Sequence, residues 1–318
     1  MLSIFTRFLS YVRRLFPQSI VRVSLVLDHD SLTVYTLSNY SAYIAHIKSS
    51  PTYEGCADMA AVERQEQGRF PIIVSHGKCS VCNTERNFYS DFKFADVVDG
   101  VKYPNWRERM VCLRCLLGNR QRAAYHLFVR YCQPDENTRI YLTEQNTAYY
   151  RMLKSRFPST TGSEYLGDVL PQGASDRKGR RNEDLCALTF DDASFNVVLT
   201  YDVLEHVPDY NTAIVEMYRI LKPGGCLMIS VPFAPPSSEN IVRAKLNADG
   251  AVEHILEPEY HGDPLQSDGC LCYYHFGWEL LDDLRHAGFE DAGVMFYWSR
   301  EYGYLGGEQV MISARKPK

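Results

Sequence analysis

Four cysteines have the residue type and the spacing of a metal site. Cys79 and Cys82 form one C-x-x-C pair, and Cys112 and Cys115 form a second one. Two such pairs are what a tetrahedral four-cysteine zinc site requires, with two thiolates from each pair. The alternatives for the four are a buried thiol cluster and a redox pair. If they bind Zn²⁺, all four coordination positions are filled, so we expect a structural zinc without an open catalytic position.

Aromatic residues lie between and around the two cysteine pairs. A small metal-binding module uses such residues as its minimal core, because it has few other apolar side chains to bury. They could also stack on nucleic-acid bases, but no basic stripe accompanies them. We expect the zinc module and a linker helix over residues 76–133, with these aromatics inside: Phe88, Tyr89, Phe92, Phe94, Tyr103 and Trp106.

Composition limits the class of protein. The chain has 318 residues, 45% of them hydrophobic and 23% charged, with a formal net charge of −5. The acidic balance argues against a broad phosphate-binding surface and therefore against nucleic acid as a partner. No apolar run approaches the length of a membrane span. Arg7, Arg13 and Arg14 interrupt the apolar N-terminal segment, so no secretory signal is evident, and we expect a cytoplasmic protein with reduced cysteines.

The front of the chain carries weaker signals. Residues 2–16 have helical apolar periodicity and three arginines, which fits a basic amphipathic helix on a membrane surface or a helix packed on its own domain. Residues 20–27 and 32–37 are predicted to be strands joined by a turn at 28–31. Residues 1–75 as a whole receive no predicted fold.

From residue 138 onward, β-rich runs alternate with helical segments. This alternation predicts a parallel sheet covered by helices on both faces, within a domain over residues 134–318. A sharp turn is expected at Pro223-Gly224-Gly225. The predicted strands are 138–143, 162–166, 195–200, 226–231, 292–298 and 309–314, and the predicted helices are 146–157, 211–221 and 278–287.

Polar residues follow the first two of these strands. In a doubly wound sheet, ligands bind at the carboxyl ends of the strands, which places Thr143, Glu144 and Gln145 at a candidate cofactor loop. Glu164 follows the next strand at a distance that suits a carboxylate accepting both ribose hydroxyls of a nucleoside. A solvated strand-end charge is the alternative. Asp184 could accept the adenine amine or could cap a local turn.

Two segments carry a family resemblance. Residues 188–209 include Ser-Phe-Asn-Val-Val followed by Leu-Glu-His-Val, and residues 216–233 include Leu-Lys-Pro-Gly-Gly before a strand. Together they resemble class I S-adenosylmethionine (SAM)-dependent methyltransferases of the type 11 group. The resemblance implies an α/β fold with a Rossmann-like seven-stranded sheet whose last strand is antiparallel, here joined to a small N-terminal zinc-binding module.

The resemblance also implies site residues. Glu164 would bind the SAM ribose, Asp184 with Leu185 would bind the adenine, and Tyr201 with Asp202 would line the sulfonium side. The chain departs from the family at the first loop, which is normally glycine-rich but contains no glycine over residues 143–147. Glu144 could pair with the cofactor's amino group, or the pocket has been rebuilt or lost.

The acceptor side is expected around His206 and the insertion at residues 234–277. Methyl transfer needs mainly alignment, and it needs a base only when the acceptor must lose a proton. His206 could be that base or a packed helix-start histidine. The insertion could form a lid, a second metal site or ordinary packing, because it is dense in ligand types. Its acceptor-side candidates are Tyr260, His261 and His275.

The predicted function is therefore methyl transfer from SAM to an oxygen or nitrogen of a small-molecule or glycan-type acceptor. One alternative is a non-catalytic methyltransferase-like zinc scaffold. A second is a membrane-peripheral module that meets a lipid-linked glycan through residues 2–16. A Rossmann dehydrogenase would need G-x-G-x-x-G after the first strand, and radical SAM chemistry would need C-x-x-x-C-x-x-C, and neither motif occurs in the sequence.

Overall fold

The computed structural model describes residues 20–23, 32–49, 72–98, 100–262, 265 and 268–318. The helix expected over residues 2–16 and the turn expected at 28–31 lie outside these ranges. Within them, no helix combines the length and apolar character needed to cross a membrane. The chain divides into two compact units. Unit 1 comprises Met1–Tyr35, Ser50–Tyr131 and Phe296–Gln309, and unit 2 comprises Thr36–Ser49, Cys132–Met295 and Val310–Lys318.

These units differ from the boundaries expected at residues 75 and 133. Unit 2 resumes at Cys132, close to the expected start at 134, but it also takes Thr36–Ser49 from the front of the chain. Phe296–Gln309, which was expected in the later domain, belongs to unit 1. The physical reason is strand length, because β18 (Glu290–Ser299) and β19 (Tyr304–Arg315) are long enough to contribute residues to both units.

Unit 1 is built on a four-stranded sheet with the order β1-β3-β4-β7. β3 and β4 form an antiparallel hairpin that pairs Ile72 with Asp91 and Cys79 with Thr84. The predicted hairpin between residues 20–27 and 32–37 is wrong, because β1 pairs in parallel with β3 while β2 joins the other large sheet. The strand bounds are β1 Ile20–Val23, β3 Ile72–Cys79, β4 Thr84–Asp91, β5 Asp96–Val98, β6 Val101–Tyr103 and β7 Val111–Cys112.

A buried arginine on helix α4 (Asn119–Cys132) organises the core of unit 1. The Arg122 guanidinium lies 4.0 Å from the centre of the Phe88 ring. It donates to the backbone carbonyls of Met110 at 3.1 Å and Tyr302 at 2.6 Å. These acceptors and the aromatic face compensate for the loss of water around a fully buried charge.

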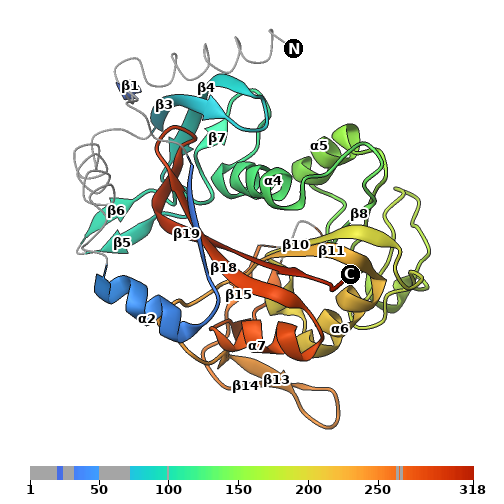
Figure 1. The fold of residues 1–318 in the computed structure, drawn as a ribbon. Coiled ribbons are helices and arrows are strands. Elements are labelled where there is room, and N and C mark those ends of the chain that lie inside the picture. The colour runs from blue at the N-terminus through green and yellow to red at the C-terminus, as the bar shows by residue number, and fades with distance from the viewer. Residues whose placement is uncertain (1–19, 24–31, 50–71, 99, 263–264, 266–267) are drawn as a thin grey trace. The chain divides into compact units, whose positions relative to one another are not determined.

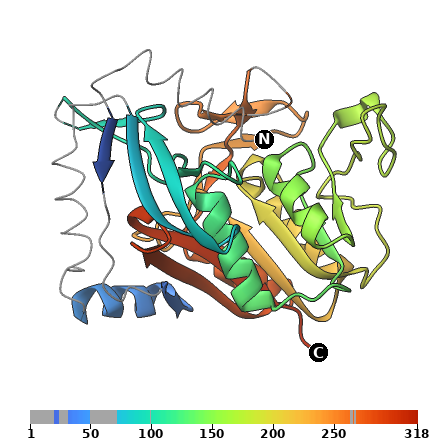
Figure 2. The same cartoon turned by 90° about the horizontal axis from the view of Figure 1, so that it is seen from above.

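The large sheet has seven strands in the order β2-β18-β19-β11-β10-β8-β9. β9, β8, β10 and β11 are mutually parallel, and β19 pairs antiparallel with β11, as the family resemblance implied. The Rossmann-like methyltransferase fold class is therefore confirmed. Figure 2 shows the twist across the yellow-to-red strands. The remaining bounds are β2 Thr33–Leu37, β8 Ile140–Leu142, β9 Thr160–Gly162, β10 Phe195–Tyr201 and β11 Leu221–Ser230.

The edges of this sheet depart from expectation. One edge strand, β2, comes from the front section for which no fold was predicted. Beyond β9, pairing continues as an isolated parallel bridge between Glu164 and Asn182. The Pro223-Gly224-Gly225 turn exists as a bulge within β11, because the β10 partner shifts from Leu221 to Cys226 there and Gly224 has φ +76°.

Helices cover the sheet of unit 2. α6 and α7 lie on one face of β10 and β11, and α5 lies on the other (Figure 1). α6 begins after Asp209, whose side chain accepts from the Thr212 amide, and it buries an apolar stripe at Ala213, Ile214 and Met217. The helix bounds are α2 Tyr40–Ser49, α5 Ala148–Arg156, α6 Tyr210–Ile220 and α7 Glu279–His286, with the 3₁₀ turns η1 Gly167–Val169 and η2 Leu204–His206.

The insertion over residues 234–277 forms three small antiparallel pairs, orange in Figure 1. The Tyr273 amide ties it to the end of η2 by donating to the Glu205 carbonyl at 2.8 Å. Phe276 forms a parallel bridge with Phe233, just after β11. The paired strands are β12 Ile241–Val242 with β17 Tyr274–His275, β13 Ala244–Leu246 with β14 Val252–His254, and β15 Tyr260–His261 with β16 Cys270–Leu271.

Candidate functional site

The loop after β8 and the residue after β9 meet at the carboxyl edge of the sheet. Glu164 is 8% exposed, and its Oε1 accepts from the amides of Gln145 at 2.8 Å and Asn146 at 2.6 Å. A carboxylate that accepts two backbone N–H groups holds its own orientation and that of the loop. The structure thus brings together the predicted loop and the predicted ribose residue.

Side chains and a neighbouring glycine shape the glycine-free loop. The Gln145 side chain donates from Nε2 to the Gly179 carbonyl at 2.8 Å, and its Oε1 accepts from the Arg181 backbone amide at 2.8 Å. A Cβ at Gly162, at the end of β9, would lie 2.6 Å from the Tyr150 ring and 2.7 Å from the Glu144 carbonyl. The backbone of the first loop therefore comes close to the backbone of β9 at Gly162, so the glycine that permits this approach lies on β9 and not in the loop.

The start of α5 and the end of β8 complete this region. The helix was expected from Asn146 but begins at Ala148, because Thr147 is the N-cap and accepts from the Tyr150 amide at 3.0 Å. Thr143 is buried, and among the described residues its Oγ1 has no hydrogen-bond partner. A buried hydroxyl without a partner is costly, so it marks a place where a ligand group could bond.

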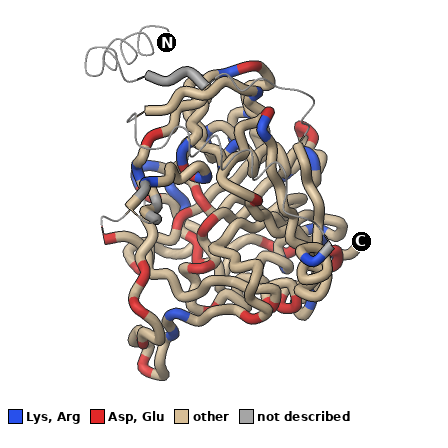
Figure 3. Tube along the Cα trace, turned by 90° about the vertical axis from the view of Figure 1, so that its left-hand side faces the viewer, with Lys and Arg blue, Asp and Glu red and all other residues tan. Residues whose placement is uncertain are grey.

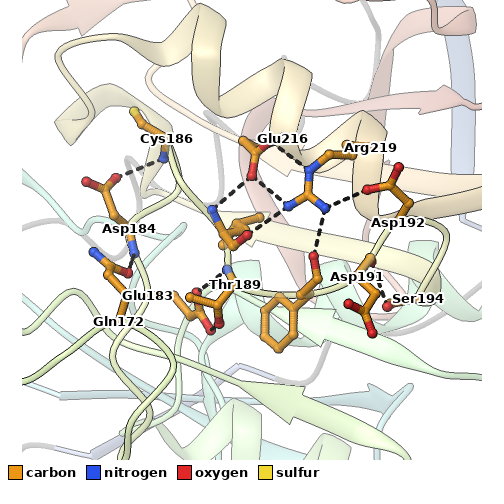
Figure 4. Close-up of polar contacts among 12 residues, drawn as sticks. Gln172, Glu183, Asp184, Cys186, Thr189, Asp191, Asp192, Ser194, Glu216 and Arg219 are labelled. Atoms are coloured by element: carbon orange, nitrogen blue, oxygen red, sulfur yellow. Dashed lines mark hydrogen bonds and ion pairs between the residues drawn. The ribbon is translucent and has the colours of Figure 1, made fainter.

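Asp184 and Leu185 lie in a tight turn after the Glu164–Asn182 bridge. Asp184 Oδ1 accepts from the Cys186 amide at 2.8 Å, and the Asp184 amide donates to Gln172 at 2.7 Å (Figure 4). Leu185 is buried. The local cap that was the alternative for Asp184 is thus present, and it holds the carboxylate on the turn.

Arg219 on α6 anchors the stretch that follows this turn. Its guanidinium donates to Glu216 at 2.8 Å, to the Leu188 carbonyl at 2.8 Å and to the Phe190 carbonyl at 2.7 Å (Figure 4). Glu216 also accepts from the Leu188 amide at 2.9 Å. The hydrogen bonds from Glu216 and then Asp192 raise the pKa of Arg219 further above its ordinary value. The Arg219 guanidinium therefore holds the loop through hydrogen bonds to the Glu216 carboxylate and to two backbone carbonyls.

Tyr201 and Asp202 end β10, as predicted. Asp202 has φ +53°, its amide donates to the Ser230 carbonyl at 2.7 Å, and its Oδ1 accepts from the Ser230 hydroxyl at 2.9 Å. The Tyr201 ring meets the Tyr149 ring edge to face, with centroids 5.5 Å apart. Burial raises the pKa of Tyr201 well above its usual value, so the phenol is neutral.

The three histidines predicted for the acceptor side lie next to two carboxylates, those of Glu205 and Glu259. The rings of His206 and His261 pack edge to face with centroids 4.9 Å apart. His261 and His275 both donate to Glu259 Oε1, at 2.9 and 3.0 Å. Contacts with Cys272 first and Glu205 next raise the pKa of His261 to about 11. Three of the four predicted acceptor-side residues thus form one cluster, and we call these three histidines with Glu205 and Glu259 the histidine–glutamate cluster.

Tyr260 does not point into this cluster. Its side chain is 57% exposed, because alternate residues of a strand face opposite sides and His261 takes the inward position of β15. Two residues in these regions were not predicted from the sequence. One is Glu205, which stood in the Leu-Glu-His-Val segment and could have been found there. The other is Tyr165, which follows Glu164 and is 63% exposed.

The four cysteines of unit 1 lie within reach of one ion. Their sulfur atoms all lie within 4.8 Å of one another. Cys79 and Cys115 are 3.8 Å apart, and Cys82 and Cys112 are 3.9 Å apart. The amides of Cys82 and Arg114 donate to the sulfurs of Cys79 and Cys112, each at 3.4 Å. Both C-x-x-C pairs therefore form knuckles in which the backbone supports the thiolates.

Comparisons with known proteins point to methyltransferases. Residues 146–229 match a family described as a methyltransferase domain. A demethylmenaquinone methyltransferase from Staphylococcus epidermidis is 39% identical over 83 residues, which are 24% of this chain and 34% of the relative. A probable S-adenosylmethionine-dependent methyltransferase from Mycobacterium tuberculosis is 31% identical over 121 residues, 35% of this chain and 42% of the relative. The chain spans about a third of the length of the first of these curated relatives.

Solved structures give weaker likenesses. An S-adenosylmethionine-dependent methyltransferase from Mesorhizobium loti is 18% identical with a TM-score of 0.39, over 61% of this chain and 98% of that protein. A putative methyltransferase from Listeria monocytogenes is 14% identical with a TM-score of 0.39, over 62% and 99%. The segment that matches the methyltransferase domain family lies wholly within unit 2 and runs from the loop before α5 to near the end of β11.

Proposed function

We propose that unit 2 transfers a methyl group from SAM to an acceptor. The observation that carries the proposal is the set of groups at the ends of β8 and β9, within a segment that matches a methyltransferase domain. These groups are the buried Thr143 hydroxyl without a partner, the oriented Glu164 carboxylate and the exposed Tyr165 ring. A nucleoside cofactor is bound by groups of these three kinds, namely a hydroxyl oxygen that accepts a hydrogen bond, a carboxylate and an aromatic ring face.

The residues present fit SAM. Glu164 would accept hydrogen bonds from the ribose, and Tyr165 would stack on the adenine opposite Leu185. The pKa of Tyr165 is raised, first by its partial burial and next by the charge of Asp184. Asp184 would receive the adenine amine. Thr143, Glu144 and Gln145 would contact the methionine part, and Tyr201 with Asp202 would border the sulfonium.

The protein's part in the reaction is alignment. SAM supplies an already activated methyl group, so the chain needs to hold the acceptor in line and exclude water. His206 follows β10 and belongs to the histidine–glutamate cluster, so it can position an acceptor hydroxyl or amine and take its proton. His261 and His275 would orient the acceptor, and the exposed Tyr260 would cover it from the insertion, which would act as a lid.

The proposed acceptor is a small molecule or a glycan-type molecule methylated on oxygen or nitrogen. Lys and Arg are interspersed with Asp and Glu along the trace (Figure 3), and the net charge is −5. A nucleic-acid acceptor would favour a basic surface instead. Recognition through neutral and charged hydrogen bonds at the histidine–glutamate cluster suits a polyol or an amine.

The four cysteines of unit 1 are proposed to bind structural Zn²⁺. Zinc–sulfur bonds of about 2.3 Å at the tetrahedral angle separate neighbouring sulfurs by about 3.8 Å. The Cys79–Cys115 and Cys82–Cys112 sulfur separations, 3.8 and 3.9 Å, agree with this value. Cys79, Cys82, Cys112 and Cys115 would be the ligands, with no open position for chemistry.

The deciding experiment is titration calorimetry of SAM and S-adenosylhomocysteine into zinc-loaded protein. We expect micromolar binding in the wild type. Glu164→Ala should weaken it by about 3 kcal/mol, roughly 100-fold, because charged hydrogen bonds are lost. Glu164→Gln keeps an oxygen for the loop amides, so it should leave the loop intact but still weaken binding. The matched control is Asp168→Asn, an exposed acid near the same strand end.

A non-catalytic scaffold is the second candidate. The observation in its favour is that Glu164 Oε1 and the Gln145 side chain already bond within the protein. A folded, zinc-replete sample that binds neither SAM nor S-adenosylhomocysteine would reject methyl transfer and support the scaffold.

A further inference from the structure

Glu205 is a buried carboxylate without a hydrogen-bond donor. Its side chain is 0% exposed, and among the described residues neither of its oxygens has a hydrogen-bond partner. The nearest polar atoms are His261 Nδ1 at 3.5 Å and His206 Nε2 at 3.7 Å, both measured to Oε1. Hydrogen bonds from nitrogen to oxygen are about 2.7–3.2 Å long, so both contacts are too long. A buried carboxylate without a hydrogen bond is costly unless a cation beside it compensates for the lost water.

In the neutral form of each imidazole, the two histidines would turn lone pairs towards this carboxylate. His206 Nδ1 donates to the Leu271 carbonyl at 2.8 Å, so the lone pair of the neutral ring is on Nε2, on the side of Glu205. His261 Nε2 donates to Glu259 at 2.9 Å, so the lone pair of the neutral ring is on Nδ1, on the same side. A backbone carbonyl or a carboxylate behind each imidazole is the usual outer arrangement of histidine metal ligands, because it selects the tautomer and orients the ring.

The separations suit an ion between the three side chains. Bonds of about 2.0–2.2 Å from Zn²⁺ to nitrogen or oxygen place neighbouring ligand atoms about 3.3–3.6 Å apart at the tetrahedral angle. The carboxylate lies 3.5 Å from one imidazole nitrogen and 3.7 Å from the other. The three ligand atoms all lie within 4.8 Å of one another. A small shift of the side chains would complete the coordination.

We propose that Glu205, His206 and His261 bind a divalent cation of the first transition row, with Zn²⁺ as the best match to two imidazoles and a carboxylate. This site is separate from the four cysteines. With the ion bound, His206 Nε2 would be a ligand, so a water bound to the ion rather than His206 would take the acceptor proton. Three protein ligands leave a position for water or a substrate oxygen, as in catalytic zinc sites. The His261 side chain is 29% exposed, so an ion can enter on that side.

Two other arrangements of the same residues would give different results in the metal analysis described below. In the first, His261 is an imidazolium that neutralises Glu205, with no metal. In the second, the ion binds Glu259, His261 and Cys272, whose ligand atoms also lie within 4.8 Å of one another. Against the second, the Cys272 thiol donates to the Tyr274 carbonyl at 3.2 Å, and Glu259 is already a hydrogen-bond acceptor of His261.

Metal analysis of the full chain, dialysed after loading with Zn²⁺, distinguishes these arrangements. We expect two zinc ions per wild-type chain and one per chain in Glu205→Gln and in His206→Ala. Cys272→Ser should keep both ions, and so should His254→Ala, a control histidine on an exposed hairpin. One ion in the wild type would overturn the proposal, and so would loss of the second ion in Cys272→Ser but not in Glu205→Gln.

Cobalt absorption gives the same answer without relying on the folding of a variant. The first equivalent of Co²⁺ should produce thiolate charge-transfer bands from the cysteine site, and the second should add only d–d bands. A second equivalent that adds thiolate bands would contradict the proposed ligand set. Glu259→Gln should weaken the second site about 10- to 100-fold, because Glu259 only positions His261.

Discussion

At the scale of single residues, Tyr165 offers a direct test of the proposed cofactor site. Its ring is 63% exposed, so Tyr165→Ala should leave the thermal stability nearly unchanged. The variant should weaken SAM binding by about 0.5–1.5 kcal/mol, because adenine loses an aromatic face, and Tyr165→Phe should restore it. Calorimetry measures both affinities. Unchanged affinity in Tyr165→Ala would exclude Tyr165 from the cofactor site.

Asp91 in unit 1 gives a pH-dependent prediction. It accepts from Arg109 Nε at 2.6 Å and Nη2 at 2.8 Å. Burial alone would raise the pKa of Asp91, but the Arg109 hydrogen bonds outweigh burial and lower it. A depressed folded-state pKa contributes stability above the unfolded value of about 3.9, and that stability is lost as the pH falls through the folded-state pKa.

Asp91→Asn should therefore lower the free energy of unfolding by about 1–3 kcal/mol at pH 7. The difference between variant and wild type should shrink as the pH falls below about 4. Denaturant titrations at several pH values measure it, with the exposed Asp249→Asn as a control for the charge change. A difference that does not depend on pH would show that the ion pair is not its source.

At the scale of elements, the contact between β9 and the first loop decides the shape of the proposed cofactor region. A Cβ at Gly162 would lie 2.6 Å from the Tyr150 ring and 2.7 Å from the Glu144 carbonyl, so Gly162→Ala forces the loop or α5 to move. We expect a loss of about 1–3 kcal/mol of stability and weaker SAM binding. Gly262→Ala is the matched control, because nothing lies within 4 Å of a Cβ there. Equal melting temperatures for the two variants would contradict this prediction.

The hydrogen bonds of the Arg219 guanidinium are the second contact that acts between elements, because they join α6 to the loop that carries Asp184. Arg219→Lys should destabilise the protein nearly as much as Arg219→Ala, by about 2–4 kcal/mol, since an ammonium cannot reach two carbonyls and Glu216 together. SAM affinity should fall in both variants. Arg151→Ala, on the exposed side of α5, is the control. Full stability and affinity in Arg219→Lys would mean that charge alone holds the loop.

At the scale of the whole molecule, removal of zinc should act through unit 1. Chelation or Cys115→Ser should lower the melting temperature and expose the core around Phe88, because structural zinc supplies folding free energy. Zinc content and melting curves with and without chelator check this. Cys132→Ser is the control, since it changes a cysteine outside the four-sulfur cluster. A Cys115→Ser protein that keeps its zinc and its stability would refute the four-cysteine site.

Local sequence pattern predicted most elements of unit 2 and several of the residues that end its strands. Strand and helix periodicity predicted β10, α6, α7 and the two last strands to within a few residues, because buried faces impose period 2 or 3.6 on apolar positions. The residue pairs Cys79–Cys82 and Cys112–Cys115 identified their own cluster, since short-range spacing already determines a knuckle. Glu164 was predictable as a strand-end carboxylate for the same local reason.

Only the tertiary structure decided which distant residues meet. β2 joins the large sheet as an edge strand, and Phe296–Gln309 belongs to unit 1, because strand partners are chosen by the whole fold rather than by local pattern. The Glu205 carboxylate lies beside His261, 56 positions away in the numbering, only because the insertion folds back onto η2. Its burial without a donor is a property of packing, which no local sequence pattern specifies.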